Sequence, residues 1–204
     1  MLRYNRRRTL LVVALMTALA TGLSVLPLAH TQEARRMSTW KPQFNAKGEL
    51  KLPSNYHEWT FLGSPLTPHA LNNGQAAFPE YHNVYVHPEA LKAYRSTGSW
   101  PEGTIMLKEL QLTRPATNPD GSSVEVSGRG FFPAARNGID ISVKDSKRFA
   151  ATKGWGFFNF GHHAPPYAAQ AAEQPKAACA GCHMSNADDM VFTKFYAPIL
   201  SAKP

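Results

Sequence analysis

The sequence predicts an α+β fold in which an antiparallel β-sheet is followed by a helical C-terminal segment. In the middle of the chain, apolar and polar residues alternate as they do in half-buried strands, whereas near the C-terminus apolar residues recur at helical spacing. Strands first, helices last and short connections are typical of this class. The 204 residues include 16 prolines and 14 glycines, which favours a loop-rich domain over a helical bundle.

Four segments are expected to form the strands. The clearest alternation is that of Ile139, Ile141 and Val143 with the intervening Asp140 and Ser142. The expected strands cover residues 81–86, 104–112, 139–143 and 155–160. A turn or exposed hairpin loop is expected at residues 117–123, where Asn, Pro, Asp, Gly and Ser follow one another.

Two regions are expected to be helical. Pro88 and Gly98 are the start and stop signals of a short helix between the first two strands. The last roughly 30 residues form the second region, and its segment 188–200 places apolar residues four positions apart, as in the pair Val191 and Phe195.

The N-terminus has the features of an export signal, because four arginines precede an uncharged run from Thr9 to Ala29. We expect the export signal within residues 1–29 to be cleaved, since its Thr, Gly, Ser and Pro content makes a poor permanent anchor. The cleavage site stays open, because Ala18-Leu19-Ala20 fits a cleavage pattern while apolar residues continue to Ala29. If uncut, these residues could hold the protein to a membrane. The expected product is a periplasmic protein with an N-terminal extension at residues 30–43 and one domain at residues 44–204.

The net charge of +8 comes from 22 basic and 14 acidic residues. The export signal contains four of the basic residues, Arg3, Arg6, Arg7 and Arg8. The body of the chain, which follows the signal, is therefore only mildly basic. No basic stretch with interleaved aromatic residues or groove-reading motif remains in the body. A nucleic-acid partner is therefore not expected.

The two cysteines of the chain point to a specific cofactor. Cys179 and Cys182 are three positions apart and His183 follows directly, which is the attachment motif of a c-type haem. On a helix both thiols reach one side, where they can join the two haem vinyl groups, while the His183 imidazole binds the iron. A thioredoxin-like redox disulfide would follow the strand of a βαβ unit, and the sequence before Cys179 does not predict one. A zinc site would need a second pair of ligands, and the sequence has none nearby. We therefore predict one covalently attached haem c.

The second axial position decides between electron transfer and catalysis. An electron carrier fills that position with Met or His, whereas a catalytic haem leaves it open. Met184 is adjacent to His183 and cannot reach the opposite face. Met106, Met190 and the seven other histidines remain possible on counting alone.

Lys108 stands at an unexpected place in its strand. Alternation puts it on the same face as Met106, Leu110 and Leu112, whereas Glu109 and Gln111 share the other face. Such a lysine either extends its ammonium group to solvent or is held inside for a chemical reason. Burial disfavours the charged form, and the neutral amine is a nucleophile.

Several segments of the chain together resemble cytochrome P-460. They are residues 52–59, 60–68, 103–110, 142–149, 179–183 and 189–196, in the same order from about Phe44 to Leu200. The resemblance implies an extracytoplasmic, homodimeric haem protein with an antiparallel sheet, in which a lysine is covalently joined to the porphyrin rim. The Lys-Glu-Leu context places that lysine at Lys108. The implied activity is oxidation of hydroxylamine to nitrous oxide or nitrite at an open distal iron site, with a soluble c-type cytochrome as electron acceptor.

The resemblance also implies groups that accept protons near the distal face. A family glutamate about nine residues before the axial histidine corresponds to Gln174, with Glu173 beside it, so this chain departs from the pattern. A family arginine corresponds to His82, which could act as a pH-sensitive distal group. His162 and His163 precede Ala164-Pro165-Pro166 and are expected in a loop, where functional groups are common.

Two other functions stay open from the sequence. The related cytochrome c-prime-beta proteins lack the lysine cross-link, line the distal pocket with phenylalanines and bind nitric oxide without catalysis. Phe61, Phe78, Phe131 and Phe132 could supply such a wall. The other possibility is an electron-transfer cytochrome with a six-coordinate haem.

Overall fold

The computed structural model describes residues 40–200 of the chain. The predicted export signal at residues 1–29 and residues 30–39 of the predicted extension lie outside the described residues. From Lys41 onward the described chain forms one compact unit. Within residues 40–200, no helix is long and apolar enough to cross a membrane.

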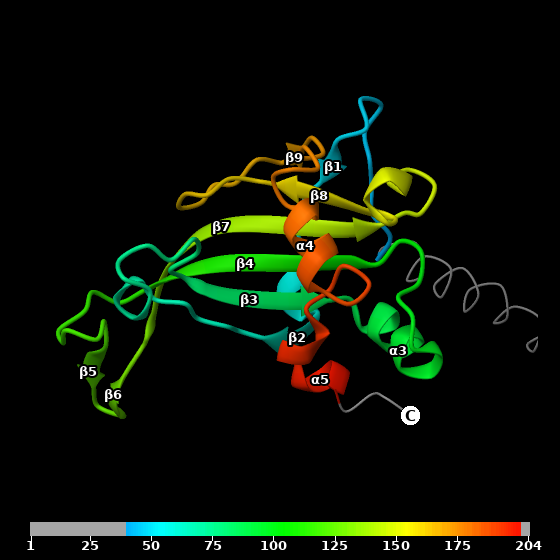
Figure 1. Cartoon of the computed structure of the whole chain (residues 1–204). Coiled ribbons are helices and arrows are strands. Elements are labelled where there is room, and N and C mark those ends of the chain that lie inside the picture. The colour runs from blue at the N-terminus through cyan, green and yellow to red at the C-terminus, as the bar shows by residue number, and fades with distance from the viewer. Residues whose placement is uncertain (1–39, 201–204) are drawn as a thin grey trace, which may run out of the picture. The chain divides into compact units, whose positions relative to one another are not determined.

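A five-stranded antiparallel sheet forms the centre of the fold, which confirms the predicted α+β class (Figure 1). Its strand order is β2-β3-β4-β7-β8, so that β4 and β7 lie in the middle. The strands are β2 (Thr60–Gly63), β3 (Tyr81–Val86), β4 (Ile105–Thr113), β7 (Pro133–Lys144) and β8 (Trp155–Asn159). All four strands predicted from the sequence are confirmed.

The strand β7 is much longer than its predicted core at residues 139–143. Its first half, from Pro133 to Gly138, pairs with the end of β4 through two register shifts. Such irregularities break the alternation of side chains between the two faces. The periodic pattern is therefore visible only in the second half, where Ile139, Ile141 and Val143 face one side.

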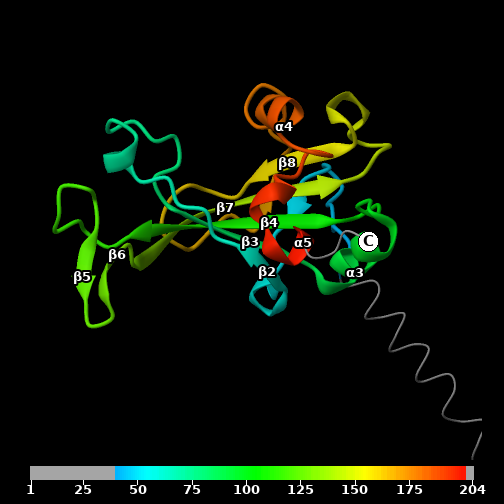
Figure 2. The ribbon, with the colours of Figure 1, turned by 60° about the horizontal axis from the view of Figure 1, so that its bottom comes forward.

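Two small sheets lie beside the central one. The hairpin β5 (Ser123–Glu125) and β6 (Gly128–Gly130) extends from one end of the sheet, as Figures 1 and 2 show. The predicted turn at residues 117–123 leads from β4 into this hairpin, as expected. The pair β1 (Leu50–Lys51) and β9 (Gln170–Ala171) joins two segments that are distant in sequence.

The predicted short helix is present as α3 (Pro88–Thr97). His87 precedes it, and the Nδ1 atom of this residue accepts a hydrogen bond from the Glu89 amide at 3.2 Å. Pro88 fits the first helical position because its fixed φ suits a helix. Gly98 ends the helix in the left-handed conformation, with φ of 72°.

The prediction of one helix over residues 188–200 is wrong. The chain forms α4 (Ala180–Asn186), a turn, the 3₁₀ helix η4 (Thr193–Phe195) and α5 (Ala197–Leu200). Asp189 and Met190 adopt φ values of 44° and 64°, in the left-handed region that an α-helix excludes. The apolar side chains four positions apart belong to a turn and two short helices that pack on the sheet. Their spacing alone does not distinguish this arrangement from one longer helix.

The main apolar core lies on one face of the sheet. Ile105 and Leu107 of β4 contribute to it, together with the 3₁₀ helix η1 (Tyr56–Glu58) and the β1–β9 pair. Its buried residues are Leu50, Tyr56, Trp59, Ile105, Leu107, Ile139, Ile141, Val143, Phe149, Phe158, Phe160 and Ala171. The opposite face carries Met106, Lys108 and Leu110, and it is the one next to α4, because it also carries Phe157, whose ring contacts His183 of that helix. Figure 2 shows α4 beside the sheet. We call this opposite face the α4 face.

Both faces of β4 are therefore buried at its centre, which the alternation pattern did not reveal. Met106 and Leu110 are buried on the α4 face, whereas Leu112 is exposed. On the core face Glu109 is only 4% exposed. Its carboxylate accepts a hydrogen bond from the Tyr56 hydroxyl at 2.6 Å and lies 3.6 Å from the Arg136 guanidinium.

Candidate haem site

The Cys-x-x-Cys-His motif lies at the beginning of α4. Cys179 directly precedes the helix, and Cys182 and His183 lie within it. Both thiols are free, with Cys179 half-buried and Cys182 exposed. Burial raises the pKa of the Cys179 thiol, so that this sulfur is protonated at neutral pH. The two sulfurs are thus available for covalent attachment of a cofactor beside α4.

The imidazole of His183 is fixed by a hydrogen bond and by two aromatic rings. Its Nδ1 atom lies 2.7 Å from the carbonyl oxygen of Met190, and because a carbonyl only accepts, Nδ1 carries the hydrogen. The ring centroids of Phe157 and Phe192 are 4.7 and 4.9 Å from that of His183. Burial lowers the pKa of His183. A neutral imidazole with its Nε2 lone pair directed away from Met190 is the form that binds a metal.

The turn that supplies the Met190 carbonyl is anchored to the α4 face of the sheet. Asp189 Oδ2 lies 2.7 Å from Nζ of Lys144, and Asp189 Oδ1 accepts from the Trp155 indole at 3.3 Å. Left-handed backbone at a non-glycine residue costs about 1–3 kcal/mol. The two contacts of Asp189, and the complete burial of Met190, offset that cost.

Lys108 lies on the α4 face, as the alternation predicted. Val84 of β3 and Asp140 of β7 are its cross-strand partners. Its Nζ atom lies 2.9 Å from Oδ2 of Asp140 and 4.2 Å from the centre of the Phe78 ring. With 26% of the side chain exposed, Lys108 neither extends freely into solvent nor lies in an apolar environment.

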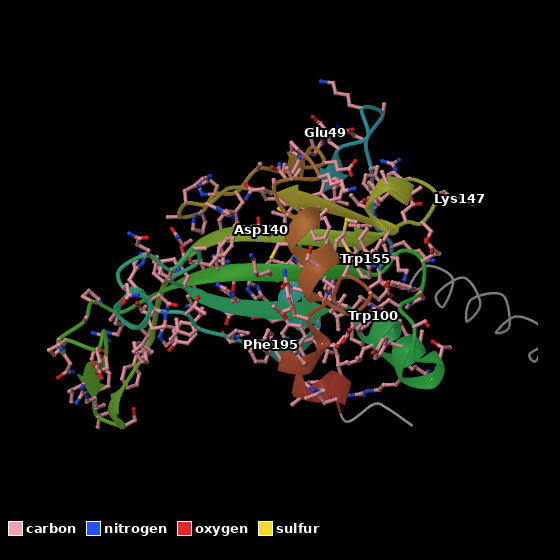
Figure 3. The ribbon with its side chains drawn as sticks, viewed as in Figure 1. Glu49, Trp100, Asp140, Lys147, Trp155 and Phe195 are labelled. Carbon is pink, nitrogen blue, oxygen red and sulfur yellow. The ribbon has the colours of Figure 1, made fainter. Side chains whose placement is uncertain are left out.

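Asp140 is a site residue that the sequence reasoning missed. Its carboxylate also accepts a hydrogen bond from Asn159 Nδ2 at 2.8 Å and lies 3.1 Å from Nε2 of His162. Burial opposes ionisation, but the hydrogen bond from His162 and the charge of Lys108 prevail and lower the pKa of Asp140 to about 2. In the view of Figure 3, Asp140 and Trp155 lie on either side of α4.

His82 lies on the same face of the sheet as Lys108. It is paired with Leu110 across β3 and β4, and its ring contacts the Phe78 ring edge-on, at a centroid distance of 5.6 Å. Burial and the positive charge of Lys108 lower the pKa of His82. The structure therefore places His82 near Lys108, and its catalytic role stays a prediction.

The two candidates before the haem motif face opposite sides. Glu173 is bridged to Phe158, whose side chain belongs to the main core, whereas the amide of Gln174 donates to the carbonyl of the neighbouring Phe157. Gln174 therefore lies opposite Phe157 in the strand register, on the side where the Phe157 ring contacts His183. Burial raises the pKa of Glu173, and the nearby charge of Arg148 lowers it in part. This placement favours Gln174 over Glu173 as a group of the α4 face.

Of the four phenylalanines considered for a distal wall, Phe78 is the one that the structure places beside Lys108. Phe61 packs on Tyr85, which faces away from α4, at a centroid distance of 5.5 Å. Phe131 and Phe132 lie beside Gly121 and Gly130, near the β5–β6 hairpin. A continuous phenylalanine wall around Lys108 is therefore not formed by these four residues.

The donor set fits a covalently attached haem. Cys179 and Cys182 offer two free thiols three residues apart, and His183 offers an oriented Nε2. The α4 face adds apolar side chains, among them the buried Val84, Met106 and Leu110, against which a porphyrin can pack. The charges of Lys108 and Asp140 are close enough to act on the titration of both His183 and Cys179.

Comparison with known proteins supports the same cofactor. The profile of one family, described as Cytochrome P460, matches residues 53–193, which is more than half of the chain. A search among curated proteins found no match. The matched range includes the Cys-x-x-Cys-His motif, Lys108, Asp140 and His82. The chain therefore belongs to the cytochrome P460 family of haem proteins.

Proposed function

We propose that the protein is a periplasmic enzyme that oxidises hydroxylamine at a single c-type haem. Membership of the cytochrome P460 family supports a haem enzyme. The observation that carries the more specific proposal is the position of Lys108, which projects from β4 onto the same face as α4 and the haem motif. This is the residue that the resemblance assigns to the covalent bond with the porphyrin rim.

In this proposal the residues of α4 and of the α4 face have separate roles. Cys179 and Cys182 would hold the haem through thioether bonds, and Nε2 of His183, whose ring is held in place by the Met190 carbonyl, would bind its iron. Lys108 would add a third covalent tether. The bound haem supplies the redox centre that takes electrons from the substrate nitrogen. His82 and Gln174 lie on the side of the sheet where substrate protons have to be accepted.

We further propose the products, the electron acceptor and the oligomeric state from the resemblance to cytochrome P-460. The products are nitrous oxide or nitrite, the electron acceptor is a soluble c-type cytochrome, and the protein acts as a homodimer. Lys108 supports this reading over that of a nitric-oxide-binding relative, because such relatives lack the lysine tether. Nitric oxide is then a ligand of the site and not its main substrate.

The experiment is anaerobic incubation of the purified holoprotein with hydroxylamine and a redox dye. We expect dye reduction in proportion to the hydroxylamine consumed, with nitrous oxide measured in the gas phase and nitrite in solution. A protein that binds nitric oxide tightly but consumes no hydroxylamine would be the nitric-oxide-binding relative. Failure to bind carbon monoxide or cyanide would instead indicate a six-coordinate electron carrier.

A further inference from the structure

A histidine from the loop after β8 returns to the α4 face and contacts Asp140. Nε2 of His162 lies 3.1 Å from Oδ1 and 3.2 Å from Oδ2 of this carboxylate. The side-chain amide of Asn159 lies against both groups, 2.8 Å from Asp140 Oδ1 and 2.8 Å from His162 Nε2. The His162 ring also meets the Phe78 ring edge-on, at 6.2 Å between centroids. Asp140 and His162 thus form a pair directly beside Lys108.

Nε2 of His162 faces both a hydrogen-bond acceptor and a donor. The Asp140 carboxylate only accepts, whereas the Asn159 amide nitrogen, 2.8 Å from Nε2, only donates. In the neutral imidazole Nε2 therefore carries either the hydrogen given to Asp140 or the lone pair that accepts from Asn159, while Nδ1 makes no hydrogen bond within residues 40–200. In either tautomer one ring nitrogen has a lone pair that can take a proton, and because the side chain is 43% exposed, that proton can pass to solvent. A carboxylate that orients an imidazole in this way also stabilises the imidazolium that forms.

Proton release is an unavoidable part of the proposed reaction. Oxidation of two hydroxylamine molecules to nitrous oxide and water gives up four electrons and four protons. The resemblance assigns the proton acceptor to the position of Gln174, but an amide is a very weak base. Asp140 has a pKa of about 2 and therefore stays ionised at neutral pH instead of holding a proton. The site needs a group that titrates closer to neutrality.

We propose that Asp140 and His162 form the proton-accepting pair of this site, in which His162 takes the protons of hydroxylamine and Asp140 orients and stabilises its ring. The inference rests on the proposed function, and it assigns to this chain a base that replaces the missing glutamate. His162 is the catalytic residue of the pair, whereas Asp140 is a positioning residue.

The charges that face His162 come from three elements. Asp140 of β7 and Glu80, just before β3, are negative, and Lys108 of β4 is positive as long as its amine is not joined to the haem. The hydrogen bond to Asp140 raises the pKa of His162, while burial and Lys108 lower it in part. His82 lies beyond the shared Phe78 ring. Asp140 therefore strengthens His162 as a base, and its removal has to shift the titration of His162 to lower pH.

The test is the rate at which cyanide binds to the ferric holoprotein. Hydrogen cyanide is undissociated at neutral pH and must give its proton to a nearby base when it binds as the anion. We expect His162→Gln to slow cyanide association about 100-fold at neutral pH and to remove the inflection of the rate with pH. The matched control is His163→Gln, because His163 contacts the Ala164 carbonyl at 2.7 Å and not Asp140.

Carbon monoxide binding to the ferrous protein separates proton transfer from access, because it involves no proton. The proposal requires the carbon monoxide rate of His162→Gln to equal that of the parent. Equal slowing of both ligands, or cyanide kinetics unchanged from those of His163→Gln, overturns the proposal. Asp140→Asn tests the positioning role: we expect a lower maximal cyanide rate and an inflection at lower pH, and an unmoved inflection contradicts it.

The same experiments distinguish this inference from the proposed function. A parent that consumes no hydroxylamine, but whose cyanide binding depends on His162, refutes the function and leaves the proton-accepting pair in place. A parent that oxidises hydroxylamine, but whose cyanide binding ignores His162, refutes the pair alone.

Discussion

Nδ1 of His183 donates a hydrogen bond to the carbonyl oxygen of Met190, seven residues further along the chain. This contact exists because Asp189 and Met190 adopt left-handed backbone and turn the chain back toward α4. A hydrogen bond from the second ring nitrogen orients a metal-binding imidazole and makes it a stronger ligand. The sharp turn after α4 is therefore part of the haem site and not only a connection.

Loosening this turn is expected to change the redox potential of the haem. Asp189→Ala removes the contacts with Lys144 and Trp155. We expect a loss of about 1 kcal/mol in the free energy of unfolding. We also expect a higher midpoint potential, because a less basic His183 stabilises oxidised iron less. Asp188→Ala is the matched control, and equal potentials of the two variants in a spectroelectrochemical titration would contradict this role of the turn.

The covalent tether at Lys108 predicts a spectral change on substitution. Lys108→Ala is expected to keep the haem, held by Cys179, Cys182 and His183, but to lose the red-shifted optical bands and most hydroxylamine oxidation. The matched control is Lys147→Ala, whose lysine is exposed on the loop after β7. Parent-like spectrum and turnover in Lys108→Ala would show that this lysine forms only the ion pair with Asp140.

The position of Gln174 predicts a gain of activity. Gln174→Glu places a carboxylate where the family has one, and a carboxylate is a far stronger base than an amide. We expect hydroxylamine turnover to rise, because the new carboxylate adds a second proton acceptor to the one that His162 provides. Glu173→Gln, which changes the neighbour on the opposite face, should leave turnover unchanged. Unchanged turnover in Gln174→Glu would leave His162 and His82 as the remaining bases.

The buried hydrogen bond between Tyr56 and Glu109 predicts a pH dependence of stability. Burial, together with the hydrogen bond and charge of Glu109, raises the pKa of Tyr56. Its contribution is complete below the unfolded tyrosine pKa of about 10 and is lost as the pH rises above it. Urea unfolding from about pH 9 to about pH 11 should therefore show a smaller loss of stability in Tyr56→Phe than in the parent. Parallel curves would argue against the raised pKa.

Local patterns predicted the sheet well where the register of its strands is regular. The alternation in β4 and in the second half of β7 predicted the faces of these strands, including the face of Lys108. The first half of β7 was not predicted, because its register shifts against β4 break the alternation. The C-terminal helix was overpredicted for a related reason: the left-handed residues Asp189 and Met190 are ordinary in sequence.

The candidate site was predictable only where its residues are neighbours in sequence. Cys179, Cys182 and His183 form a contiguous motif, and Lys108 was found from alternation within one strand. Asp140 also alternates with apolar residues, but its contact with Lys108 depends on the register between β4 and β7. His162 lies in a loop, 22 residues further along the chain than Asp140. No local sequence pattern predicts a contact between these two residues.

The central claim is that one haem is joined to both α4 and Lys108, and peptide mass spectrometry of the trypsin-digested holoprotein tests it most directly. A modified Lys108 resists trypsin, and Arg114 is protected by the following proline. The claim therefore predicts residues 96–129 as one peptide, linked through the haem to residues 177–194. Separate peptides 96–108 and 109–129, with the haem on residues 177–194 alone, would contradict the tether at Lys108.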